Sequence, residues 1–141
     1  MRHVLVIAAL LIATAPPPVA GQSKVVFVVN KANVIDSLST AKLKAIFLGK
    51  MSHWPGGAEI IPIDLPDNSP PKQAVIMSVL ETTPDKLAQY WIEQKLTGNI
   101  NPPMKLPGVG AVKSVVALRP GAIAYIPIEA VDNTVKILKA Q

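Results

Sequence analysis

Short β-branched apolar runs alternate with helix-like segments along the chain, and this alternation most constrains its fold. Strands are predicted at Lys24–Asn30, Glu59–Asp64, Ala122–Pro127 and Thr134–Leu138. Unbroken runs such as VVFVV and AIAYI are typical of strands buried on both faces. Pro62 is expected to shorten the second strand or to displace it to a sheet edge. Strands that alternate with helices predict an α/β fold with a largely parallel sheet.

The intervening segments carry start and stop signals for helices. Helices are expected after the N-cap residues Ser39, Ser69 and Thr83. The second and third of these caps are followed by proline, which favours the first helical position. Gly49 and Gly98 are expected to end the first and third helices, and a shorter helix is expected within Gly110–Gly121.

The N-terminus has the three-part form of a secretory signal peptide. A basic start at Arg2 precedes the apolar run Val4–Ala13 and a small-residue, proline-containing stretch. The apolar run is shorter than the roughly 20 residues of a membrane-spanning helix. We expect cleavage after Gly21, periplasmic export without membrane insertion, and a single mature domain over residues 22–141. The alternative is an uncleaved N-terminal membrane anchor.

The composition excludes several classes of function. The chain has no cysteine, which excludes a disulfide scaffold, a thiolate zinc site and a cysteine nucleophile. Removal of Arg2 lowers the formal net charge from +5 to +4, and the remaining basic residues are dispersed, so no nucleic-acid surface is expected. His53 would be the one mature histidine, and neither a metal site nor a cofactor is predicted.

Ser69-Pro70-Pro71-Lys72 has the S-x-x-K spacing of penicillin-recognising acyltransferases. One helical turn would bring the hydroxyl and the amine to one face. The companion S-D-N is absent, and Lys95–Gly98 is only a near match to K-T-G. We therefore expect no enzyme, with Ser69 as an N-cap and Lys72 as a solvated residue.

Asp64 and Asp67 flank Pro66 and form the one notable pair of carboxylates. Two carboxylates on a bent loop make an incomplete cation site. The favoured interpretation is that both are turn formers that cap nearby amide groups.

Four motifs together resemble the phosphate-binding-protein-like solute-binding family. The resemblance covers about Val25 to Pro127, nearly all of the predicted mature chain. The motifs are the helix end Ile46–Lys50, the turn Trp54–Gly57, Ser69 at a helix start, and the strand entry Pro120–Tyr125. Ala124 replaces the glycine of the family's P-G-A-I-G-Y pattern.

The resemblance implies a periplasmic binding-protein fold of the second type, in which helix N-termini hold an anion between two α/β lobes. The family's phosphate motif, an arginine and then Ser-Gly-Thr, would fall at Asp64–Lys72. Here Asp64 or a neighbour stands in the arginine's place, and Pro70 and Pro71 replace the glycine and threonine. Proline has no N–H to donate. We therefore expect a weakened or altered site for a small anion such as phosphate, around Asn68, Ser69 and Lys72.

The predicted mature chain has about half the length that a two-lobed binding protein needs, so a single lobe is expected. The alternative function is an interaction module of the bacterial envelope without a small-molecule ligand, or self-association through the open face. Its candidate contacts are Met51, Trp54, Pro55 and the loop Pro102–Met104. For Trp54, a side chain folded back on the core is the favoured interpretation.

Overall fold

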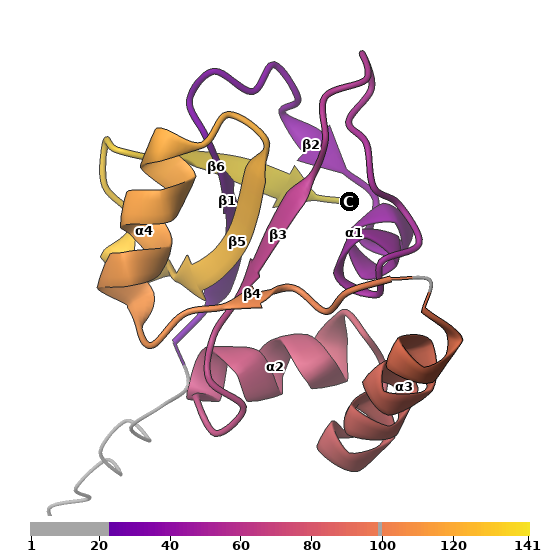
Figure 1. Ribbon diagram of the computed structural model, residues 1–141. Helices are drawn as coiled ribbons and strands as arrows, with labels where there is room; N and C mark the ends of the chain where they lie inside the picture. Colours follow the sequence, from indigo (N-terminus) through magenta and orange to yellow (C-terminus); the bar gives the residue numbers. More distant parts are fainter. Residues whose placement is uncertain (1–22, 99) are drawn as a thin grey trace, which may run out of the picture.

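The computed structural model describes residues 23–98 and 100–141, and these form a six-stranded sheet with helices against both faces (Figure 1). The strands are β1 (Val25–Val29), β2 (Ser37–Leu38), β3 (Ile61–Asp64), β4 (Met104–Lys105), β5 (Ala122–Pro127) and β6 (Lys136–Ala140). The helices are α1 (Thr40–Phe47), α2 (Pro70–Ser78), α3 (Pro84–Thr97), α4 (Val109–Leu118) and the short 3₁₀ turn η1 (Ile128–Ala130).

The sheet is mixed, with the strand order β2-β6-β1-β5-β3-β4. Three of its five pairings are parallel, namely β2 with β6, β3 with β4, and β3 with β5. β1 runs antiparallel to both of its neighbours, β5 and β6. The predicted α/β class with a mostly parallel sheet is confirmed.

Alternate residues of β1 point to opposite layers of the core. Phe27 faces α1, and its ring contacts Phe47 and Tyr125 at centroid distances of 5.7 and 6.2 Å. On the other face, Asn30 just after β1 donates from Nδ2 to the Val116 carbonyl at the end of α4, at 2.8 Å. The central strands are therefore covered on both sides, as their unbroken apolar runs predict.

The helices begin after the predicted N-cap residues, and two of the three predicted side-chain caps form. The Ser39 Oγ accepts from the Lys42 N–H at 3.2 Å, and the Thr83 Oγ1 accepts from the Lys86 N–H at 3.3 Å. Gly98 ends α3 in the left-handed conformation with φ of 72°. These local signals fixed the helices because each cap satisfies an otherwise free backbone group.

Two short strands and one placement differ from the prediction. β2 and β4 contain two residues each, and neither has a strand-like sequence pattern. β3 is shortened to four residues as expected, but it is not an edge strand, because β4 pairs with its last residues Ile63 and Asp64.

Trp54 lies in the core, which confirms the favoured interpretation of its side chain and removes it from the candidate contacts on an open face. Its side chain is 6% exposed, and Nε1 donates to the Gly121 carbonyl at 3.0 Å. This bond ties the turn after α1 to the entry of β5. Met51 also packs against the core, whereas Pro55, Pro102 and Met104 are exposed and Pro103 is half-buried.

The predicted signal peptide and its cleavage site lie outside the described residues. Within residues 23–98 and 100–141, no helix is long and apolar enough to cross a membrane.

Glu81, in the connection from α2 to α3, has a positive φ of 52°, which L-residues rarely adopt. Glu81→Gly is expected to raise the free energy of unfolding by about 0.5 kcal/mol, because relief of this strain exceeds the added freedom of the unfolded chain. Chemical denaturation measures the change. The control Glu93→Gly, inside α3, should lower the free energy of unfolding by about 1 kcal/mol. If Glu81→Gly lowered the free energy of unfolding as much as Glu93→Gly, this would contradict backbone strain at Glu81.

Candidate anion site

A buried cluster of polar side chains lies where β3 ends and α2 begins. Asp64 is the last residue of β3, Lys72 is in the first turn of α2, and Tyr125 is in the middle of β5. Their exposed fractions are 6%, 6% and 1%. Groups this polar are buried only when they are paired and hydrogen-bonded.

The Asp64 carboxylate accepts hydrogen bonds from a residue of α2, a residue of β5 and the backbone just after β3. Lys72 Nζ donates to Oδ2, and the Tyr125 hydroxyl donates to Oδ1. The Leu65 backbone N–H also donates to Oδ1, at 2.9 Å. Burial, together with the neighbouring Asp64 charge, raises the pKa of Tyr125 far above its ordinary value, so the phenol remains a donor. The cluster is an internal carboxylate bound by an ammonium, a hydroxyl and an amide.

The first turn of α2 offers few donors to an external anion. Pro70 and Pro71 occupy its first two positions and have no N–H. The Ser69 hydroxyl does not cap the helix; it donates to the Pro66 carbonyl at 2.7 Å. The first helical residue with an N–H is Lys72, whose ammonium already binds Asp64.

The structure separates the three residues predicted to form the anion site. Asn68 and Ser69 line a cavity of ≈ 510 Å³ on one side of α2. Lys72 points to the opposite side, into the buried cluster, and is not the solvated residue that the sequence suggested. Whether Asn68, Ser69 and Lys72 bind a ligand remains a prediction.

This cavity has mostly apolar walls and extends to the start of α4. Leu65, Ala74 and five prolines line it, and Pro107, Gly108 and Val109 belong to the α4 side. Gly108 is the N-cap residue of α4 and offers no side-chain cap. The α4 side of the cavity was not predicted from the sequence, and Gly108 and Gly110 gave no signal for it, because a Cβ added at either position would meet no atom within 4 Å.

The S-x-x-K pair is not assembled as a nucleophile and base. The Ser69 hydroxyl bonds to the Pro66 carbonyl, and Lys72 Nζ bonds to Asp64. A base must reach the proton that it removes. Neither group is placed to activate the other.

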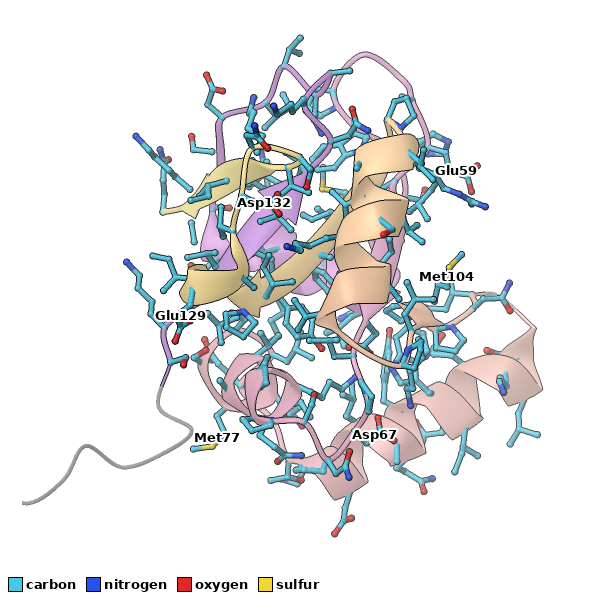
Figure 2. All side chains as sticks on the ribbon, turned by 90° about the vertical axis from the view of Figure 1, so that its left-hand side faces the viewer. Glu59, Asp67, Met77, Met104, Glu129 and Asp132 are labelled. Atoms are coloured by element: carbon cyan, nitrogen blue, oxygen red, sulfur yellow. The ribbon has the colours of Figure 1, made fainter. Side chains whose placement is uncertain are left out.

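The two carboxylates around Pro66 have different surroundings. Asp64 caps the Leu65 amide, as expected of a turn former, but it is also the buried partner of Lys72, which the sequence analysis missed. Asp67 is exposed and accepts from Lys105 Nζ at 2.8 Å. This hydrogen bond holds the pKa of Asp67 below its ordinary value. Figure 2 shows Asp67 and Met104 on the side of the molecule where α2, α3 and β4 meet.

In the part of the chain that the structure describes, no three His, Asp or Glu side chains gather as a metal site would require. His53 is exposed, and its Nδ1 lies 2.9 Å from the Ser52 hydroxyl.

No protein-family profile matches the chain. Several solved structures of phosphate transport proteins have a similar fold. A putative phosphate ABC transporter substrate-binding protein with bound phosphate from Clostridium perfringens has a TM-score of 0.66 and 25% identity, covering 84% of this chain and 45% of that one. An ABC-type phosphate transport receptor from Vibrio cholerae has a TM-score of 0.60 and 18% identity over 84% of this chain and 46% of that one.

PstS from Borrelia burgdorferi is also similar, with a TM-score of 0.62 and 15% identity over 84% of this chain and 47% of that one. The chain thus spans slightly less than half the length of the structures that it matches. The fold is that of a type 2 periplasmic binding protein, which confirms the resemblance predicted from the sequence motifs.

Proposed function

We propose that this chain is a secreted, periplasmic, solute-binding-like lobe that has an altered anion site and no enzymatic activity. It is related to the substrate-binding proteins of phosphate ABC transporters, and it does not hold phosphate tightly. The observation that carries the proposal is the buried ion pair between the Lys72 ammonium and the Asp64 carboxylate, which occupies the cation that an anionic ligand would need.

Three further features of the site support this proposal. Pro70 and Pro71 remove donors at the positive end of α2, where anions bind through free N–H groups. The Ser69 hydroxyl already donates its hydrogen bond to the Pro66 carbonyl. The exposed Asp67 carboxylate repels an incoming anion, although the paired Lys105 ammonium partly neutralises this carboxylate. Each feature lowers affinity for a dianion such as phosphate.

Calorimetric titration of the chain with inorganic phosphate at near-neutral pH tests the proposal. We expect no saturation below about 1 mM, which corresponds to a binding free energy weaker than about −4 kcal/mol. A dissociation constant in the micromolar range would contradict it. Chloride at the same ionic strength is the control, since any response that it reproduces is nonspecific screening.

The second candidate is an envelope interaction module without a small-molecule ligand, or one that self-associates. The exposure of Pro55, Pro102 and Met104 supports this candidate. The burial of Trp54 in the core weakens it, because a buried side chain cannot contact a partner. Sedimentation reports a dimer directly, and a monomer at all accessible concentrations would count against self-association.

A further inference from the structure

A groove of ≈ 600 Å³ runs along one face of α3, on the side of α2 away from Ser69. The α3 residues that line it include Asp85, Ala88, Trp91 and Lys95, which recur every three or four positions. This spacing marks one continuous helix face. Lys72 of α2 and the segment from Pro102 to Lys105 form the opposite wall. Figure 1 shows α2, α3 and the chain through β4 around this region.

The middle of the groove is apolar. Ile76 and Leu87 are 2% and 6% exposed and form its floor. Trp91 is half-buried, with its ring centroid 5.0 Å from that of Tyr90. An apolar floor with a half-exposed indole provides binding energy through area removed from water.

The two ends of the groove carry opposite charges. Asp85 lies in the first turn of α3, and Lys95 lies in the last turn. Among residues 23–98 and 100–141, neither side chain has an ion-pair partner, whereas the groove's other acidic residues, Asp64 and Asp67, pair with Lys72 and Lys105. Ten residues of helix separate the two ends by roughly 15 Å.

We propose that this groove binds a short apolar peptide in an extended conformation, with both of its termini free. The ammonium of such a peptide matches Asp85, and its carboxylate matches Lys95. A separation of roughly 15 Å corresponds to four or five extended residues at about 3.3 Å each. The apolar side chains lie on Ile76, Leu87 and Trp91. The proposal goes beyond the altered anion site, because the peptide would contact α3, although Asp64 and Lys72 also line this groove.

Tryptophan fluorescence tests the proposal on the whole chain, because its two tryptophans differ in position. Trp91 lines the groove, and Trp54 is buried away from it. The probe is the tetrapeptide Ala-Val-Leu-Ala with free termini. We expect a saturable change in emission that disappears in Trp91→Phe, which retains Trp54. The absence of saturation up to about 10 mM peptide would overturn the proposal.

Charge matching is tested with modified peptide and protein. The same tetrapeptide, acetylated and amidated, is expected to bind about tenfold more weakly. Asp85→Asn and Lys95→Gln should each weaken binding of the free peptide about threefold and leave binding of the capped peptide unchanged. Lys86→Gln, an exposed α3 position outside the groove, is the matched control. Equal affinities for free and capped peptides would overturn the proposed orientation and the peptide assignment with it.

Discussion

Lys72→Met is expected to lower the free energy of unfolding by about 3–5 kcal/mol, because it leaves the buried Asp64 carboxylate without its cation. The Tyr125 hydroxyl and the Leu65 amide still donate to Asp64, but neither carries a compensating charge. In a domain of this size, the loss corresponds to a fall in melting temperature of about 10–20 °C. Thermal and urea denaturation both measure it.

Two variants separate a lost ion pair from lost packing. The double variant Asp64→Asn/Lys72→Met removes both charges, and it should recover at least about 2 kcal/mol of the loss. Lys86→Met, at an exposed position of α3, should change stability by no more than about 0.5 kcal/mol. A loss below about 1 kcal/mol in Lys72→Met would show that the ion pair is not a structural element of the domain.

Gly121→Ala is expected to lower the free energy of unfolding by about 3 kcal/mol, because a Cβ at this position would lie 2.2 Å from the Glu59 carbonyl oxygen. That oxygen belongs to the backbone just before β3, so the clash cannot be relieved by a rotamer change. The Gly121 carbonyl also accepts from the Trp54 indole and from the Ile61 N–H. Any shift of Gly121 therefore also disturbs the turn after α1 and the start of β3.

The matched control is Gly110→Ala in α4, where an added Cβ meets no atom within 4 Å. It should be neutral or stabilise the domain by up to about 1 kcal/mol through helix propensity. Urea denaturation of the two variants side by side gives the comparison. Similar stabilities for both would contradict the close approach at Gly121.

The sequence predicted the helices and the long strands because their signals are local. Ser39, Thr83 and Gly98 satisfy helix ends directly, and the runs in β1 and β5 mark strands covered on both faces. β2 and β4 could not be predicted in this way. Each has two residues, and each exists only because a distant strand, β6 or β3, supplies its hydrogen bonds.

The sequence contains a signal for the buried cluster in the spacing of α2 around Lys72. Lys72 precedes Val75, Ile76 and Val79 at helical spacing, so it falls on the buried stripe of α2. A lysine on a buried stripe requires a buried anion. The position of Asp64 at the end of a buried strand made it a natural partner, but only the β3–α2 geometry brings the two together. Trp54 was similarly ambiguous, because its partner Gly121 is 67 residues away.

The proposed function attributes weak phosphate binding to the pairing of Lys72 with Asp64 and to the missing donors at the start of α2. The most direct measurement is the calorimetric affinity for inorganic phosphate of the native sequence and of Pro70→Gly/Pro71→Thr, under identical conditions. The substitutions restore two N–H groups and a hydroxyl at the helix start. We expect the native sequence to bind phosphate with a dissociation constant above about 1 mM, and the variant to bind it at least about tenfold more tightly. Micromolar binding by the native sequence, or no gain in a folded variant, would contradict this attribution.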